Sequence, residues 1–255
     1  MHHIFFSCHG QTKTSEDFLG IQIASDLHIE FYGELGEIPK DIIVPSAPVL
    51  ALVGDISLVF TDLLRDFLWQ QTDRFEEVLF VAGNHEFYNV RGDTKTIEEQ
   101  WQWLEEVCSK RKNLHLLEKK SIEIKGVKIL GTALWSHIPK DVQPRAASSL
   151  NDYHICFTNV STVIATQETR KLHPFDTSQW HSQNVDWLNQ EICQAGANNQ
   201  PLVVLTHHTP MIQGTSAPEY EGSELNACFS TDLTNLLRPP VKAWACGHTH
   251  WNFDK

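Results

Sequence analysis

The feature that most constrains the fold of this chain is a series of short, predominantly apolar segments that each end abruptly in polar residues. Five of these segments are four to six residues long and rich in Val, Leu, Ile and Ala, which predicts buried β-strands. They lie at 21–24, 49–53, 78–81, 202–205 and 241–246. Mainly apolar runs are typical of parallel strands covered on both faces, because few positions have to meet water.

Amphipathic stretches lie between several of the predicted strands. Apolar residues recur there at intervals of three and four, as on one face of an α-helix. These stretches are 58–75, 97–107, 177–193 and 231–237. Strands that alternate with helices predict an α/β architecture with a largely parallel sheet covered on both faces.

Two further segments depart from this alternation. Residues 121–130 resemble a hairpin, since apolar and polar residues alternate on both sides of Lys125-Gly126, so we expect some antiparallel strands as well. Residues 135–176 have no clear period. A segment this long without regular structure is usually a functional loop or lid.

The length of the chain is compatible with one large domain. Its 255 residues and 29.1 kDa lie near the upper size for a single hydrophobic core. The first strong pattern begins at Ile21, whereas the residues before it are polar and include Thr12-Lys-Thr-Ser15. We therefore expect an N-terminal extension over 1–20 and one domain over 21–255.

Composition limits the partners and the compartment. The 20 Lys and Arg residues against 32 Asp and Glu residues give a formal charge of −12, which disfavours binding to long nucleic acids or to membrane surfaces. No run approaches the roughly 18 apolar residues that a membrane helix needs, and the start of the chain is a poor signal peptide. The six cysteines form no C-x-x-C pair, so we expect free thiols in a reducing compartment, the cytoplasm.

The polar residues that follow the five strands are suited to one kind of site. In open α/β sheets, ligands bind beyond the carboxyl ends of the strands, so residues at these ends are expected to meet. The residues are Asp26, His28, Asp55, Asn84, His85, His207, His248 and His250. Glycines at 54, 83 and 247 precede three of these groups and allow sharp turns and close approach of a ligand.

Histidine and carboxylate side chains in such a cluster point to a metal site. Imidazole and carboxylate ligands bind Mn, Fe or Zn, whereas sites built only from oxygen favour Mg or Ca. In Asp26-x-His28, as in the Gly-His-x-His block at 247–250, two side chains share one face of an extended segment. Seven potential ligands are too many for one tetrahedral ion, but they suit two ions about 4 Å apart that share a carboxylate.

Together these motifs resemble those of the calcineurin-like metallophosphoesterases. The matching residues are Asp26-x-His28, Gly54-Asp55, Gly83-Asn84-His85-Glu86, His207 and Gly247-His248-x-His250, which span nearly the whole chain. A Thr-His-His-x-Pro block at 206–210 and an Asn-Asp-Tyr segment at 151–153 are similar to a small, bacterial-type branch. The resemblance implies a sandwich of two mixed β-sheets flanked by helices, of which the strand pattern alone does not indicate the second sheet.

The resemblance also implies a role for each residue of the cluster. It implies two divalent or trivalent metal ions, Mn, Fe or Zn, bridged by Asp55. Asp26, His28 and His250 would hold the first ion, and Asn84, His207 and His248 would hold the second. His85 would not be a ligand but would contact the phosphate and protonate the leaving oxygen. His208 is not expected to be a ligand.

These roles predict a metal-dependent phosphoester hydrolase that uses a water activated by two metals. We expect a phosphodiesterase acting on a small or nucleotide-like substrate. A phosphomonoesterase or protein phosphatase, a catalytically silent metal-binding scaffold, and a mononuclear zinc hydrolase of another fold are the alternatives. For Glu86, orienting a neighbouring ligand and capping the following helix are equally good explanations.

Other polar residues are expected to be bystanders. His137, Arg145, His154 and His173 lie in the segment without a clear period and are more simply explained as surface residues than as phosphate contacts. Five residues follow His250, whereas members of the family usually continue with another strand and turn. We expect this difference to affect the completeness of the sheet more than the metal site.

Overall fold

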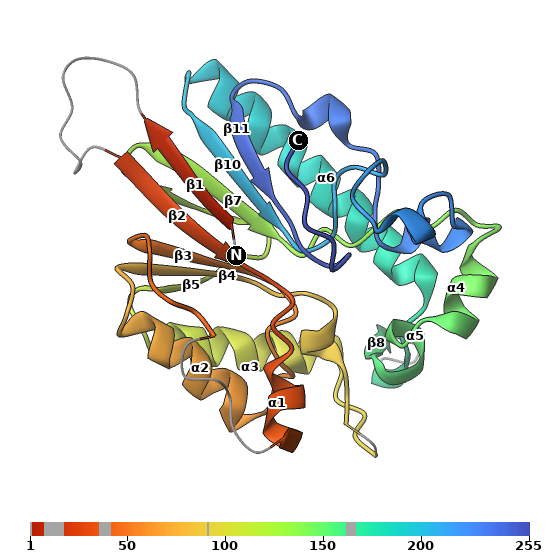
Figure 1. Ribbon diagram of the computed structural model, residues 1–255. Helices are drawn as coiled ribbons and strands as arrows, with labels where there is room; N and C mark the ends of the chain where they lie inside the picture. Colours follow the sequence, from red (N-terminus) through yellow and green to blue (C-terminus); the bar gives the residue numbers. More distant parts are fainter. Residues whose placement is uncertain (1, 8–17, 36–41, 91, 162–166) are drawn as a thin grey trace.

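Two β-sheets face each other in the structure, and helices cover their outer faces (Figure 1). The structure is a computed structural model that describes residues 2–7, 18–35, 42–90, 92–161 and 167–255. This arrangement confirms the expected sandwich of two mixed sheets flanked by helices. It also contains the second sheet, which the strand pattern alone did not indicate.

The first sheet has five strands in the order β1-β2-β3-β4-β5. They are β1 (His2–Ser7), β2 (Phe18–Ala24), β3 (Val49–Val53), β4 (Glu77–Val81) and β5 (Leu114–Leu116). Strands β2 to β5 are parallel, and β1 pairs antiparallel with β2 at the edge. The sequence pattern missed β5, because three residues are too few to show a period.

Part of the segment expected to be an N-terminal extension forms an edge of this sheet. Strand β1 pairs with β2 from His2 opposite Ile23 to Ser7 opposite Phe18, and β2 begins before the predicted start at Ile21. Backbone pairing at a sheet edge does not require a regular apolar pattern, which explains why the sequence did not reveal it. Residues 8–17 lie outside the described residues, and the division into 1–20 and 21–255 stays a prediction.

The second sheet has four strands in the order β11-β10-β7-β6. They are β6 (Lys120–Ile124), β7 (Val127–Thr132), β10 (Leu202–Thr206) and β11 (Val241–Ala245). Strands β7, β10 and β11 are parallel, and β6 pairs antiparallel with β7. This pairing confirms the hairpin predicted over 121–130.

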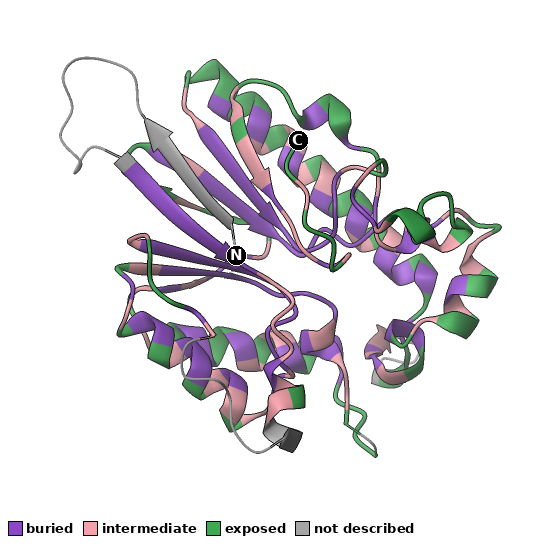
Figure 2. Ribbon diagram, viewed as in Figure 1, coloured by how far each residue is buried: buried purple, intermediate pink, exposed green. Residues whose placement is uncertain are grey.

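The two-residue period of a strand explains why β4 is apolar on both faces. Leu79 and Val81 face the other sheet and belong to the core cluster that also holds Val203 of β10. Val78 and Phe80 point the opposite way, into the cluster shared with the helices. Figure 2 shows the buried strands of both sheets between partly exposed helices. A strand covered on both sides has few positions for polar residues before it ends.

Three long helices cover the outer faces of the sandwich (Figure 1). They are α2 (Asp62–Thr72), α3 (Ile97–Ser109) and α6 (Pro174–Ala197). Helix α2 begins later than predicted because Thr61 is its N-cap and accepts a hydrogen bond from Leu64 N–H at 3.2 Å. Helix α6 begins earlier, since Pro174 follows the N-cap His173.

The helix predicted over 231–237 is wrong. Only a single 3-10 turn, η5 (Thr234–Leu236), forms there. Asp232 Oδ1 accepts hydrogen bonds from the Thr234 N–H at 3.0 Å and from its hydroxyl at 2.7 Å. Local bonds of this kind satisfy the backbone without a helix and compete with helix formation.

The segment 135–176 contains more regular structure than the expected loop. Its elements are α4 (Gln143–Ser149), α5 (Asp152–Ile155), β8 (Phe157–Ser161) and β9 (Gln167–Lys171). The remaining short helices of the described chain are α1 (Ile29–Leu35), η2 (His85–Phe87), η3 (Pro218–Tyr220) and η4 (Glu224–Cys228). The two helices in the segment are too short to display a period, and β9 (Gln-Glu-Thr-Arg-Lys) contains no apolar residue that could indicate a strand.

The cysteines and the helices also bear on the expected compartment. Cys8 lies outside the described residues, and the other five cysteines form no disulfide. Among the described residues, no helix combines the length and the hydropathy that crossing a membrane would require.

Candidate metal centre

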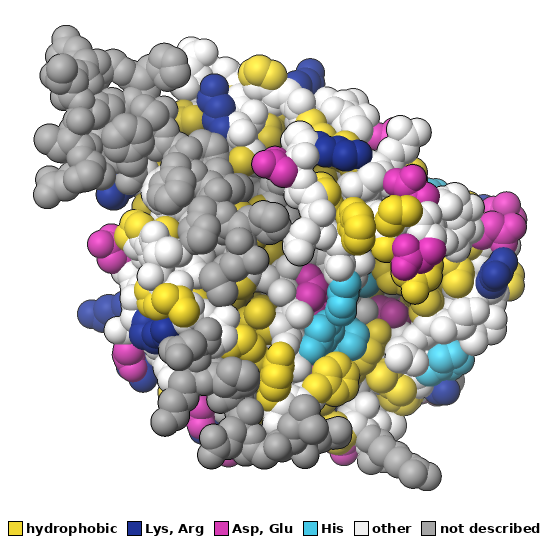
Figure 3. Space-filling view, viewed as in Figure 1, with side chains coloured by type: hydrophobic (Ala, Val, Ile, Leu, Met, Phe, Trp, Pro, Cys, Tyr) yellow, Lys and Arg dark blue, Asp and Glu magenta, His cyan; other side chains and the backbone are white. Residues whose placement is uncertain are grey.

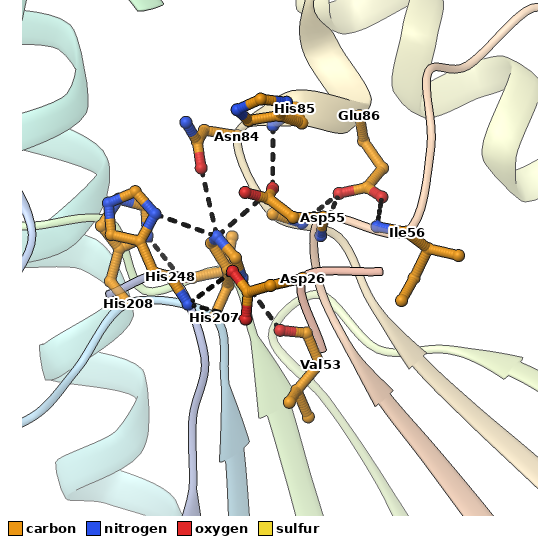
Figure 4. A network of polar contacts seen from close by, with 12 residues as sticks. Asp26, Val53, Asp55, Ile56, Asn84, His85, Glu86, His207, His208 and His248 are labelled. Atoms are coloured by element: carbon orange, nitrogen blue, oxygen red, sulfur yellow. Dashed lines mark hydrogen bonds and ion pairs between the residues drawn. The ribbon is translucent and has the colours of Figure 1, made fainter. Parts of the chain in front are cut away.

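The loops that follow the predicted strands meet at one edge of the sandwich (Figure 4). Backbone hydrogen bonds join them: Asp26 N–H donates to the Gly54 carbonyl at 3.0 Å, and Gly247 N–H donates to the His207 carbonyl at 2.9 Å. The two sheets are connected as well, because His248 N–H donates to Asp26 Oδ1 at 2.9 Å. The structure therefore brings together all eight residues that the strand ends predicted.

Four of these residues form an outer donor group. Asp26, His28, Asp55 and His250 each offer one ligand atom, and these atoms lie within 4.8 Å of one another. His28 Nε2 is 3.1 Å from His250 Nε2, which in turn is 3.5 Å from Asp26 Oδ1. The His250 side chain is 59 % exposed, so water reaches this group directly.

A second, inner donor group lies deeper in the sandwich. Asp55, His207 and His248 also offer ligand atoms within 4.8 Å of one another. His207 Nε2 is 3.1 Å from Asn84 Oδ1 and 3.3 Å from Asp55 Oδ1. The His207 side chain is fully buried.

Asp55 belongs to both groups through different oxygens. Its Oδ1 faces His207 at 3.3 Å, whereas its Oδ2 faces His28 at 3.9 Å. Burial opposes ionisation of this carboxyl group, but the neighbouring His207 holds its pKa well below the usual range. A carboxylate placed in this way can bridge two cations.

The surroundings of His207 test whether these residues fit metal ions. His207 Nδ1 lies 2.9 Å from the Val53 carbonyl, to which it donates, so Nε2 is the atom that faces the inner group. Around Nε2 stand Asn84 Oδ1 and Asp55 Oδ1, which are both acceptors. Burial opposes a charge on His207, yet Asp55 raises its pKa to about 10, so this point attracts a positive charge. The mixed nitrogen and oxygen donors therefore fit cations such as Mn, Fe or Zn.

Backbone strain is concentrated at the donor residues. Five of them have positive φ, the left-handed region that non-glycine residues rarely adopt. The values are 53° for Asp26, 44° for His28, 54° for Asp55, 72° for His248 and 52° for His250. Each such residue costs on the order of 1–3 kcal/mol and persists only where the surrounding structure fixes it, which is typical of functional sites.

Two glycines leave room for the inner group. A Cβ atom at Gly54 would collide with the His207 ring, and one at Gly83 would collide with the Asp55 carboxylate. Gly54 also has a φ of 91°. The Gly-Asp and Gly-Asn-His-Glu motifs thus need glycine for close packing between the two loops.

Glu86 fastens these two loops to each other. Its fully buried carboxylate accepts hydrogen bonds from Asp55 N–H at 2.9 Å, from Ile56 N–H at 2.7 Å and from Gly83 N–H at 2.6 Å. Burial and the charge of Asp55 raise its pKa to about 7. Of the two explanations left open by the sequence, the structure supports orientation of a neighbouring ligand.

His85 lies outside the outer and inner donor groups, but its ligand atom and those of His28 and Glu30 also lie within 4.8 Å of one another. Its Nδ1 is 3.5 Å from Glu30 Oε1, which is also 3.3 Å from His28 Nδ1. Burial disfavours the charged ring, but the Glu30 hydrogen bond and the charge of Asp55 raise the pKa of His85 above its ordinary value. Sequence analysis missed Glu30, although its position two residues after His28 was an available signal.

Asn84 is oriented by a chain of hydrogen bonds that the sequence also did not reveal. Its Nδ2 donates to the Tyr88 hydroxyl at 3.0 Å, and that hydroxyl donates to Asp152 Oδ2 at 3.3 Å. The amide oxygen of Asn84 is thereby directed at His207. Asp152 belongs to the Asn-Asp-Tyr segment, which had no expected role.

His208 is buried next to the inner group. Its ring centroid lies 4.0 Å from that of His248, and its Nδ1 is 3.3 Å from the Ala133 carbonyl. It belongs to neither donor group, in keeping with the expectation that it is not a ligand.

The expected bystanders have other partners. Arg145 forms an ion pair with Glu224 at 2.7 Å, and His154 contacts the Ser148 carbonyl at 3.2 Å. His173 caps helix α6, where its Nδ1 accepts from Phe175 N–H at 3.1 Å. None of these three side chains lies in a described donor group.

Comparison with known proteins identifies the family of the chain. A family model described as calcineurin-like phosphoesterase matches residues 21–252. Uncharacterized protein L509 of Acanthamoeba polyphaga mimivirus is 28% identical over 246 residues, which cover 91% of this chain and 84% of that protein. The crystal structure of Phosphopantetheinyl Hydrolase (PptH) from Mycobacterium tuberculosis has a similar fold, with a TM-score of 0.62 and 18% identity over 90% of this chain and 82% of that one. The chain therefore belongs to the calcineurin-like phosphoesterase family and is a metal-dependent hydrolase that acts on phosphoester bonds.

Proposed function

We propose that the protein is a phosphodiesterase that acts on a small or nucleotide-like substrate and uses two metal ions. Asp26, His28 and His250 would hold the outer ion, and Asp55 would be shared with the inner one. Asn84, His207 and His248 would be the further ligands of the inner ion. We further propose that the protein works in the cytoplasm, which the five free cysteines support.

The observation that carries this proposal is the position of Asp55. Its Oδ1 belongs to the inner donor group and its Oδ2 to the outer one, and the carboxylate is only 2 % exposed. Its backbone is held by Glu86, and its Oδ1 also accepts a hydrogen bond from His85 N–H at 2.9 Å. A carboxylate held this firmly between two sets of imidazoles is suited to a shared ligand.

Two metal ions would supply an acidified water and neutralise the charge on the phosphoryl oxygens. The chain itself would supply the proton for the leaving oxygen. His85 is suited to this role, because it is 23 % exposed, lies beside Asp55 and has Glu30 at its Nδ1. With Nδ1 fixed in this way, Nε2 is the atom available to a substrate oxygen.

A small organic substrate is supported by the shape of the site and by the fold comparison. The donor groups open into a pocket of limited volume rather than onto a flat surface. The similar fold of a protein named as a phosphopantetheinyl hydrolase supports an organic phosphoester as the substrate.

Two generic esters test the reaction. With added Mn²⁺, we expect a higher kcat/KM for bis(4-nitrophenyl) phosphate than for 4-nitrophenyl phosphate, and loss of both activities in a chelator. The reverse order would indicate a phosphomonoesterase. Full activity in the chelator would contradict the two-metal mechanism, and bound metal without hydrolysis of either ester would indicate a silent scaffold.

His85→Ala tests the assignment of the acid. General acid catalysis is worth about 10²–10⁴-fold, so kcat should fall by that factor while both metal ions stay bound. His154→Ala is a matched control, because His154 is an exposed histidine outside the donor groups. A His85→Ala protein that no longer binds metal would show that His85 is a ligand instead.

A further inference from the structure

A pocket of about 530 Å³ opens beside the metal centre. Asp55, Asn84, His85, His248 and His250 form the wall at the strand ends. The opposite wall comes from α4, α5, η3, η4 and the loops next to them. Figure 3 shows the histidines gathered on this face, with hydrophobic side chains beside them. The volume is typical of pockets that bind small organic molecules.

The opposite wall is mainly apolar and partly aromatic. Its large side chains are Trp135, Ile138, Leu150, Tyr153, Leu225 and Phe229. The apolar wall begins at the metal centre itself, because the Phe229 ring stacks on the His248 ring with 4.8 Å between centroids. An organic group attached to a phosphate at the metals would therefore lie against apolar and aromatic surface.

Away from the histidines at the strand ends, the charged side chains that line the pocket are carboxylates. Among the described lining residues there is no lysine or arginine, whereas Asp55 and Asp152 both belong to the lining. Asp152 is 8 % exposed and is held in place by the Tyr88 hydroxyl. Arg145 of α4, outside the lining, already pairs with Glu224 at 2.7 Å.

We propose that this pocket binds the organic group of a phosphoester that carries no anionic group other than the phosphate under attack. The proposal rests on the proposed function and narrows its substrate. A second phosphate or a carboxylate would lose its water against apolar walls and would face Asp152 without a cationic partner. The phosphate ester of an uncharged, partly aromatic alcohol would fit the pocket, and so would a nucleoside with a single phosphate. A nucleoside polyphosphate would not fit.

Two matched esters test whether the pocket disfavours a second anionic group on the substrate. Phenyl phosphate and 4-carboxyphenyl phosphate differ by one carboxylate, and each can be prepared as the monoester and as the methyl diester. With Mn²⁺, we expect kcat/KM to be about 100-fold lower for the carboxylated member of whichever pair is hydrolysed. Equal or faster hydrolysis of the carboxylated ester would overturn the pocket assignment and leave the proposed function intact. If neither pair were hydrolysed, the proposed function would fail and this inference with it.

Variants that change the charge of the opposite wall test whether this wall disfavours the carboxylated ester. Leu225→Arg adds a cation to the pocket. The ratio of kcat/KM for the carboxylated ester to kcat/KM for the phenyl ester should therefore rise about tenfold. Leu237→Arg adds the same charge at an exposed leucine outside the pocket and should leave the ratio unchanged. Asp152→Asn, which removes a charge with little change in size, should move the ratio in the same direction as Leu225→Arg. Because each ratio is measured on one preparation, loss of folded protein cancels, and an unchanged ratio in both pocket variants would overturn the assignment.

Discussion

The outer and inner donor groups of the metal centre contain similar side chains but differ in how far water reaches them. The His250 side chain of the outer group is 59 % exposed, whereas that of His207 in the inner group is 0 % exposed. His207 follows the central strand β10 and is fixed through Nδ1 to the Val53 carbonyl of the other sheet. His250 follows the edge strand β11 and has no comparable backbone contact among the described residues. The inner group is thus part of the folded core, and the outer group is assembled on its surface.

This difference predicts that the two ions are bound with different affinities and exchange at different rates. Burial strengthens electrostatic interactions and slows the entry of competing ligands, so the inner ion should be held more tightly and exchange more slowly. The outer ion, next to water, should be lost first when metal is limiting. Both ions would depend on Asp55, if the proposed function holds for both donor groups.

The largest effect is expected for Asp55→Asn. Loss of the shared carboxylate should weaken both ions, and charge stabilisation by two metals is worth several kcal/mol, so kcat/KM should fall by about 10⁴-fold. Asp26→Asn removes a carboxylate of the outer group alone and should cost about 10²-fold with the inner ion retained. Activity and metal content measured on both variants check this order. Equal losses in the two variants would show that Asp55 is not shared.

The next-largest effect is on the free energy of unfolding, which should differ between variants of the inner and the outer donor group. In chelator, His207→Ala leaves the buried Asp55 without its partner, so the free energy of unfolding should fall by about 3–5 kcal/mol. His250→Ala changes an exposed side chain and should shift the same free energy by no more than about 0.5 kcal/mol. Urea unfolding of both variants gives the two values. A similar loss in His250→Ala would mean that the outer group also supports the core.

A smaller effect is expected from the residue that fastens the inner loops. Glu86→Gln keeps the size of the side chain but places an amide N–H₂ group among backbone N–H donors, which should weaken the Asp55 loop. Outer-shell changes of this kind typically cost about 10–100-fold in metal affinity or activity. Glu106→Gln is a matched control, because Glu106 is an exposed glutamate of α3. Titration with Mn²⁺ measures the affinities, and unchanged binding in Glu86→Gln would contradict the orienting role.

The positions of the donor residues could be predicted because they follow strands whose apolar pattern is strong. In β3 and β10 every residue is buried, so the first polar residue after each strand marks the sheet edge. The loops after parallel strands meet at that edge whatever lies between them in the sequence. This explains why Asp55 and His207 could be brought together across 152 positions of sequence.

The supporting residues could not be predicted in the same way. Glu30, Tyr88 and Asp152 act through side-chain contacts between different elements, and no period in the sequence connects them. The second sheet was expected only from the family resemblance, since parallel strands of two sheets have the same pattern as those of one. Strand β5, with three residues, and helix α4, with seven, are each too short to show the period of their own kind of element.

The smallest expected effect concerns His181, a buried histidine behind the inner group. Its Nδ1 is 3.2 Å from the carbonyls of both Leu134 and Trp135, and the Trp135 ring contacts His208, which in turn contacts His248. Burial lowers the pKa of His181 below its ordinary value, so the folded protein keeps the ring neutral where the unfolded chain takes up a proton. Below about pH 6.5 the unfolded state therefore binds more protons, and stability should fall as the pH falls, by at most about 1.4 kcal/mol per pH unit for this one group.

His181→Gln can still donate a hydrogen bond to a carbonyl but does not titrate, so urea unfolding in chelator at pH 7.5 and pH 5 should show a weaker pH dependence than in the wild type. The same pH dependence in both proteins would show that the packing behind the inner group does not exclude a charge, and the contrast with the outer group would then be limited to the donor residues themselves.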